Sequence, residues 1–151
     1  NPEPRTPGPQ PRTPSPQPPL LLIHGVEWQA EVASTTADRV KGLSGRDTLP
    51  SGTGVLFIFE TKVASAFWMR DMRFPLDFIW ISEECTVADI TRDVPAPEPD
   101  TPVSRLPKYE SEEPAAYNFE VNAGEAERHG VQVGDPVTFV GLDDETGVVC
   151  R

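Results

Sequence analysis

The sequence predicts a mainly β (α+β) domain, a compact, twisted, β-barrel-like unit of about seven strands with two short helices. Segments of strand length, either alternating or continuously apolar, recur between residues 26 and 142. Turn-forming residues separate them at the spacing typical of a barrel or sandwich. The 151 residues allow one domain, and an unusual first stretch leaves roughly 130 of them for its core.

The first predicted elements are a strand over residues 26–33 and a short helix over residues 34–43. Along the strand, four apolar residues alternate with mostly polar neighbours, which is the period of a strand with one solvated face. The following segment, STTADRVKGL, begins with hydroxyl residues suited to an N-cap and contains Gly42 as a stop signal. Residues 44–53 are expected to form a loop.

Four further strands are predicted in the middle of the chain. Residues 54–60, GVLFIFE, form a continuous apolar run, which favours a central strand covered on both faces. Residues 64–70 and 76–82 are two more strands, separated by a turn-forming DMRFP segment. Residues 86–91 follow a short polar turn, so they should form a hairpin with the preceding strand.

The last third of the chain predicts a strand, a short helix and a closing strand. Residues 116–121 return to a strand pattern. Asn122, with Glu125 three residues later, should cap a short helix that ends before Gly130. After a turn at residues 133–136, the segment PVTFVGL supplies the closing strand.

Composition divides the chain into a linker, residues 1–19, and a domain, residues 20–151. The linker holds nine of the 18 prolines and no large apolar side chain, so it should be disordered and semi-extended. A proline-rich ligand for an SH3-like domain is the alternative. The net charge is −11, and the linker contributes +1, so the domain carries −12. This acidity argues against nucleic acid or an anionic membrane surface as partner and favours a cationic or neutral one.

Two features bear on the compartment in which the protein works. No apolar run approaches the length of a membrane span, so no direct membrane insertion of this chain is expected. The chain starts at Asn1 with a proline-rich spacer, which is typical of a secreted, periplasmic or lipoprotein-anchored protein whose signal segment has been removed. An extracytoplasmic location is therefore expected. Cys85 and Cys150 either pair with each other or remain two separate thiols.

A series of landmarks gives the chain its resemblance to a known family. They are RVKGLSGR at 39–46, LP at 49–50, GVLFIF at 54–59, FWMRDMRFPLDFIWI at 67–81, YNFEVNAG at 117–124 and GVQVGD at 130–135. Over residues 26–142 the chain resembles the DUF192 (UPF0127) family. The resemblance implies a strongly twisted, barrel-like β fold with small helices, commonly in exported or lipid-anchored proteins, and no settled molecular function.

Some positions differ from the pattern of that family. Ser44 and Val55 stand where the family usually has Met, and Asp71 and Met72 stand where it has an Asn-Thr pair. These differences argue against a methionine-rich site for a soft metal. Nucleophile, phosphate-loop, zinc and dinucleotide motifs are also missing, so neither a metal nor another cofactor is expected.

Polar residues within apolar motifs are the remaining candidates for a functional site. The polar candidates are Arg46, Arg70, Asp77 and Glu120, and the apolar residues beside them are Trp68 and Met69. A charge in a buried strand costs several kcal/mol without a partner, so such residues are either paired or exposed at a site. One interpretation is an Arg-carboxylate pair that fixes strand register. The other is a cleft that binds a small polar molecule, such as a saccharide or a carboxylate.

Under the second interpretation, the domain is a binding or accessory module for a small polar ligand. The expected oligomeric state is a monomer. Two alternatives remain open. A hydrolase would use Asp77 and Glu120 as a general acid and base that converge in one cleft. A structural or protein-interaction domain would instead show an exposed apolar patch of several hundred Å².

Overall fold

The computed structural model describes residues 19–33, 43, 45–58, 67–69, 72–142 and 150. The strands are β1 (Leu20–Ile23), β2 (Val26–Ala33), β3 (Thr53–Ile58), β4 (Phe67–Trp68), β5 (Leu76–Ile81), β6 (Val87–Val94), β7 (Lys108–Tyr109), β8 (Tyr117–Asn122) and β9 (Val137–Val140). The helices are a 3-10 turn, η1 (Val103–Arg105), and α2 (Glu125–Arg128). None of the described helices has the length and apolar character needed to cross a bilayer.

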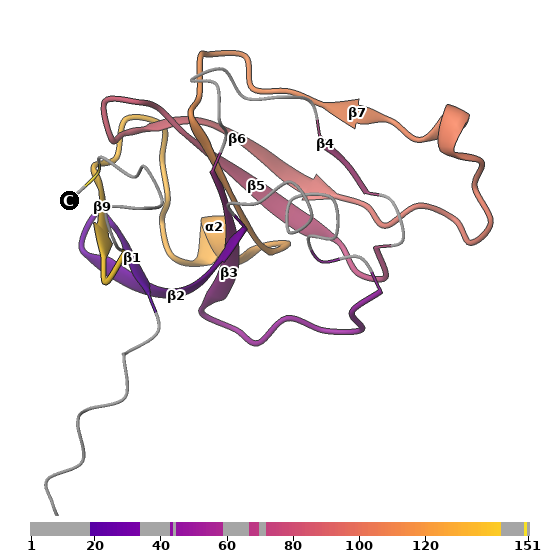
Figure 1. The fold of residues 1–151 in the computed structure, drawn as a ribbon, viewed down its shortest axis with the longest axis horizontal. Helices are drawn as coiled ribbons and strands as arrows, with labels where there is room; N and C mark the ends of the chain where they lie inside the picture. Colours follow the sequence, from indigo (N-terminus) through magenta and orange to yellow (C-terminus); the bar gives the residue numbers. More distant parts are fainter. Residues whose placement is uncertain are drawn as a thin grey trace, which may run out of the picture.

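Seven of the strands form one strongly curled sheet (Figure 1). Its order is β6-β5-β8-β3-β2-β1-β9, and every neighbouring pair is antiparallel except β2 and β3. The two edge strands meet at one end, where Thr86 bridges Pro136 and the Val137 amide donates to the Cys85 carbonyl at 2.9 Å. The predicted mainly β, barrel-like fold is therefore confirmed.

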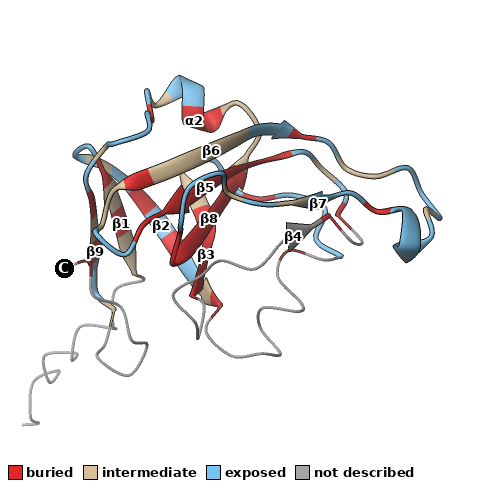
Figure 2. Ribbon diagram, turned by 90° about the horizontal axis from the view of Figure 1, so that it is seen from above, coloured by how far each residue is buried: buried red, intermediate tan, exposed pale blue. Residues whose placement is uncertain are grey.

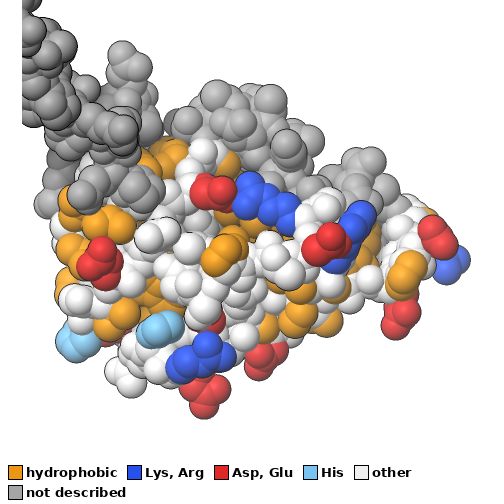
Figure 3. Space-filling view, turned by 90° about the horizontal axis from the view of Figure 1, so that it is seen from below, with side chains coloured by type: hydrophobic (Ala, Val, Ile, Leu, Met, Phe, Trp, Pro, Cys, Tyr) orange, Lys and Arg blue, Asp and Glu red, His pale blue; other side chains and the backbone are white. Residues whose placement is uncertain are grey.

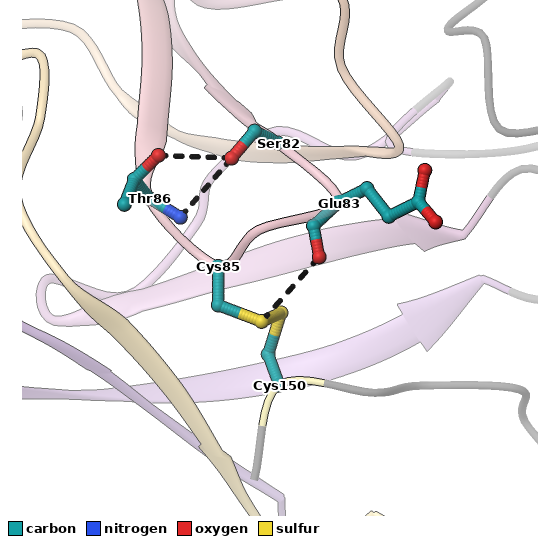
Figure 4. The surroundings of a disulfide bond; sticks show 5 residues. All are labelled: Ser82, Glu83, Cys85, Thr86 and Cys150. Atoms are coloured by element: carbon teal, nitrogen blue, oxygen red, sulfur yellow. Dashed lines mark hydrogen bonds between the residues drawn. A yellow bond between two sulfur atoms is a disulfide. The ribbon is translucent and has the colours of Figure 1, made fainter.

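A disulfide bond lies at this junction of the two edge strands (Figure 4). Cys85, in the turn before β6, is bonded to Cys150, and their Cα atoms are 5.3 Å apart. The Cys150 carbonyl accepts a hydrogen bond of 2.5 Å from the Phe139 amide of β9. The bond therefore joins the β5-β6 turn to a segment that pairs with the opposite edge of the sheet, which decides the question that the sequence left open.

Apolar side chains pack on both faces of the central strands. The inner core fills the barrel and includes Trp28, Leu56, Ile79 and Phe119. The outer core lies on the other face of β3, β8 and β5 and includes Val55, Phe57, Met69, Met72, Leu76, Phe78 and Trp80. Successive side chains of β5 point to opposite faces of the sheet, so they enter the inner and the outer core in turn. β5 is therefore buried along its whole length (Figure 2). The sequence predicted such double coverage for β3, and the structure extends it to β5.

Gly54 occupies a position on β3 where no larger side chain fits. A Cβ atom there would lie 2.6 Å from the Phe119 ring and 2.7 Å from the Glu120 carbonyl oxygen. We expect Gly54→Ala to lower the free energy of unfolding by about 2 kcal/mol or more, because the sheet must shift to admit the methyl group. Urea denaturation measures this effect. Adding Phe119→Leu should restore part of the loss, and no restoration would contradict the proposed clash.

Several predicted elements differ from the structure. The strand predicted over 64–70 is reduced, within the described residues, to Phe67–Trp68, and η1 and β7 are short elements that the sequence does not predict. The helix predicted after Asn122 begins at Glu125 instead, with Gly124 in the cap position. Asn122 does not cap it, because this residue ends β8 two positions before the cap, and its side-chain Nδ2 donates to the Leu49 carbonyl at 2.7 Å. The predicted linker up to residue 18 and most of the first helix lie outside the described residues.

Candidate functional site

Asp77 has a structural role in the inner face of the sheet. This side chain is 1% exposed, and its carboxylate accepts three backbone N–H groups, from Asp93 at 2.9 Å, Gly124 at 3.0 Å and Ala126 at 3.1 Å. Two of these donors belong to the start of α2 and the third to β6. Asp77 therefore holds the short helix and the end of β6 against β5.

Replacing Asp77 tests this structural role. We expect Asp77→Asn to destabilise the protein by about 2 kcal/mol, because an amide offers one acceptor oxygen where the carboxylate offers two. Asp47→Asn is the matched control, since Asp47 is exposed and its partner among the described residues is the exposed Arg73, and its effect should stay within about 0.5 kcal/mol. Chemical denaturation compares the two, and equal effects would show that the three backbone contacts add nothing.

The structure describes some of the other sequence-predicted residues, and these have partners or surroundings other than Asp77. Arg46 is exposed and pairs with Glu31 of β2 at 2.6 Å, a surface contact with a residue outside the predicted set. Trp68 lies in β4, paired in register with Lys108 of β7. Met69 is buried in the outer core. Arg70 lies outside the described residues.

Glu120 lies on the opposite face of the sheet from Asp77. In the register of β8 it stands beside Val55 of β3 and Phe78 of β5, both residues of the outer core. It is 4% exposed, and none of the described residues donates a hydrogen bond to its carboxyl group. Burial raises the pKa of Glu120 from 4.5 to about 8. The structure therefore does not bring Asp77 and Glu120 together as an acid-base pair.

Asn118, two residues before Glu120 on β8, shares its face of the sheet. It is fully buried, and within the described part of the chain neither its Nδ2 nor its Oδ1 has a hydrogen-bond partner. The side chains of alternate strand residues are roughly 7 Å apart, so Asn118 and Glu120 form a short buried line of hydrogen-bonding groups, here termed the polar row. Asn122 continues the line, but its amide is bonded to Leu49.

Aromatic residues border the polar row. On β5, Phe78 stands beside Glu120 and Trp80 beside Asn118, and on β3 Phe57 stands on the other side of Asn118. The Trp80 indole is fixed by its hydrogen bond to Thr91 Oγ1 at 3.0 Å. The Tyr109 ring meets Phe78 edge-on, with 5.7 Å between centroids. The row thus combines amide and carboxyl groups with flat apolar surfaces, which is the composition of a small-molecule site.

Comparison with known proteins places the fold but assigns no activity to it. The sequence profile of DUF192, described as "Uncharacterized ACR", matches residues 21–139. The chain belongs to the DUF192 family. No curated protein matches the chain significantly.

Two solved structures resemble this DUF192 domain. One is a protein of unknown function from Novosphingobium aromaticivorans DSM 12444, with 28% identity, coverage of 78% of this chain and 82% of that one, and a TM-score of 0.68. The other is a candidate transcription regulator from Sinorhizobium meliloti 1021, with 30% identity, coverage of 82% and 93%, and a TM-score of 0.67. Both likenesses agree with the fold described above.

Asn118 is the member of the polar row that the sequence does not single out as a candidate. Its signal is the alternation in β8, where Asn118, Glu120 and Asn122 interrupt an apolar strand at every second position. Such a pattern ordinarily marks a solvated face, and only the outer core turns it into a buried one. The described residues contain no cluster of three or more His, Cys, Asp or Glu side chains that could hold a metal ion.

Proposed function

We propose that this DUF192 domain is a binding module for a small polar ligand, which it takes up at the polar row on the outer face of its sheet. The observation that supports the proposal is Asn118, whose Nδ2 and Oδ1 have no hydrogen-bond partner among the described residues, next to the buried carboxyl group of Glu120, whose pKa is raised by burial alone. Buried polar groups in native proteins nearly always have partners, so their partner here is expected to come from outside the chain.

Energetics argue that the polar row does not serve stability. An unsatisfied buried polar group costs about 1 to 3 kcal/mol, and more when it is ionised. Asp77 and Glu125 show that this same fold satisfies buried carboxylates where they are structural, since both accept backbone N–H groups. Asn118 and Glu120 accept no hydrogen bond from the described backbone N–H groups. Contact with a ligand would explain why the fold keeps these two polar side chains in a buried position.

The charges of the described residues restrict the ligand. Arg46 pairs with Glu31 and Arg73 with Asp47, and both pairs lie at the surface. No described Lys or Arg forms an ion pair with Glu120. Of the two ligand types expected from the sequence, a carboxylate would therefore meet an acidic group without a compensating cation. A neutral or cationic ligand with hydrogen-bonding groups fits better.

The two alternative functions find less support. The carboxylates of Asp77 and Glu120 project to opposite faces of the sheet, so a hydrolase acting through this pair has no common cleft. Among the described residues, Val133 and Val140 are the large apolar side chains that stand exposed, too few for an interaction patch. On the face shown in Figure 3, charged side chains of both signs lie among apolar side chains and other uncharged groups.

We also propose that the domain works outside the cytoplasm. The Cys85–Cys150 disulfide supports this location, because such bonds persist in oxidising compartments and are rare in the cytosol. Alkylation of the protein in intact cells tests the proposal. Protection of both cysteines is expected, and full alkylation in the native host would contradict it.

Matched substitutions on β8 test whether the polar row is a ligand site. We expect Asn118→Leu to leave stability unchanged or to raise it, because it removes two unsatisfied polar atoms. Asn122→Leu, on the same face of the same strand, should cost about 1 kcal/mol, since it breaks the bond to Leu49. Thermal unfolding compares both variants, and NMR titration with saccharides and small amines should show binding to wild type that Asn118→Leu weakens. A marked destabilisation by Asn118→Leu would contradict the proposal.

A further inference from the structure

The surroundings of Glu120 indicate which chemical class of ligand the polar row accepts. Phe78 stands beside Glu120 in the register of the sheet, Trp80 beside Asn118, and Tyr109 completes a series of edge-on rings. The ring centroids are 6.2 Å apart for Phe78 and Trp80 and 5.7 Å apart for Phe78 and Tyr109. Aromatic faces carry partial negative charge and attract cations that lie within about 6 Å of the ring.

Charge complementarity points in the same direction. Glu120 is a buried acid without a cationic partner among the described residues, and Asn118 Oδ1 is a buried acceptor without a donor. A ligand ammonium group supplies three N–H donors and one positive charge. The net charge of −11 on the whole chain would also raise the local concentration of a cation near the domain.

We propose that the polar row binds the ammonium group of a small organic amine, with Glu120 as its counter-ion, Asn118 Oδ1 as a second acceptor and the rings of β5 beside it. This inference rests on the proposed ligand-binding function and narrows it. A polyol such as a saccharide would satisfy the same hydrogen bonds without a charge, so a matched neutral compound serves as the comparison.

Proton balance distinguishes the two kinds of ligand. The carboxyl group of Glu120 holds its proton at neutral pH because burial raises its pKa to about 8. When an ammonium group binds as an ion pair, that proton leaves to the solvent and the carboxylate remains opposite the cation. Below the pKa, affinity for the amine should therefore rise about tenfold with each pH unit. Affinity for a neutral alcohol should not change over the same range.

The experiment is an NMR titration of the ¹⁵N-labelled full chain with butylamine, butanol and butyrate, three ligands that share an alkyl chain and differ in charge. Shifts should centre on the amides of β8 and β5. We expect butylamine to bind more tightly at pH 8 than at pH 6, with an affinity about 50-fold lower at pH 6, because Glu120 is half ionised at pH 8 and about 1% ionised at pH 6. Glu120→Gln should abolish this pH dependence and weaken binding at pH 8 at least tenfold, whereas the surface variant Glu31→Gln should behave as wild type.

The outcomes separate the two proposals. Preferential, pH-independent binding of butanol would overturn the amine assignment and leave a neutral ligand at the same site. Preference for butyrate would also overturn it. If none of the three compounds binds and Asn118→Leu destabilises the protein, the polar row is structural and the proposed binding function itself fails.

Discussion

Glu120→Gln is expected to raise the stability of the domain at pH 8 and to remove most of the pH dependence of its unfolding. The pKa of Glu120 is 4.5 in its ordinary state and about 8 in the fold, because burial disfavours the ionised form. Between these two values the folded protein retains a proton that the unfolded chain has lost. Stability therefore decreases as pH rises through this window, by about 1.4 kcal/mol per pH unit, and levels off above pH 8.

Urea denaturation of wild type and variant at pH 5 and pH 8 measures this effect. The difference in unfolding free energy between Glu120→Gln and wild type should be on the order of 3 kcal/mol more favourable at pH 8 than at pH 5. Glu125→Gln provides the control, because Glu125 is equally buried but accepts hydrogen bonds from Ser51 and Gly52. That variant should be destabilised at both pH values. A Glu120→Gln variant that loses stability at pH 8 would show that Glu120 has a structural partner.

The second large effect is expected from the disulfide. The bond links residues 65 positions apart, and closing a loop of this size restricts the unfolded chain by about 4 kcal/mol in the chain-entropy model. It also fastens the junction of the two sheet edges, where Val137 and Phe139 of β9 pair with Cys85 and Cys150. Reduction should therefore lower the free energy of unfolding by about this amount.

Two variants separate the contribution of the bond from that of the cysteine side chains. Cys85→Ser and Cys150→Ser, alone or together, should match the reduced wild type in denaturant midpoint, and dithiothreitol should have no further effect on the double variant. If reduction leaves the midpoint of the wild type unchanged, the edges of the sheet are held together by backbone pairing alone.

Much of the sheet is predictable from the sequence because its strands carry clear periodicity. The continuous apolar run of β3 predicts a strand covered on both faces, and the alternation of apolar and polar residues in β2 predicts a strand with one solvated face. β1 was missed because Leu20–Ile23 is too short to show a period. Its strand state depends on pairing with β2 and β9, which are contacts formed only in the fold.

The candidate site was harder to predict because it depends on which side chains share a face. Asp77 and Glu120 look alike in sequence, since each is an acid within an apolar strand. Only the β5-β8 register shows that Asp77 is opposite Val121 and Glu120 opposite Phe78, on different faces. The backbone N–H groups that satisfy Asp77 come from β6 and α2, and no local pattern marks them. Glu120 is therefore a candidate that the sequence already offers, whereas Asn118 emerges only from the shared face of β8 in the structure.

The pKa of Glu120 itself can be read from the carboxyl ¹³C resonance of labelled protein as the pH is varied. We propose that Glu120, which is buried and has no hydrogen-bond partner among the described residues, contacts a ligand. We expect a titration midpoint at about 8 in the ligand-free protein. A midpoint near the ordinary value of 4.5 would show that the carboxylate is solvated or already paired. This result would contradict the proposal that the polar row binds a ligand.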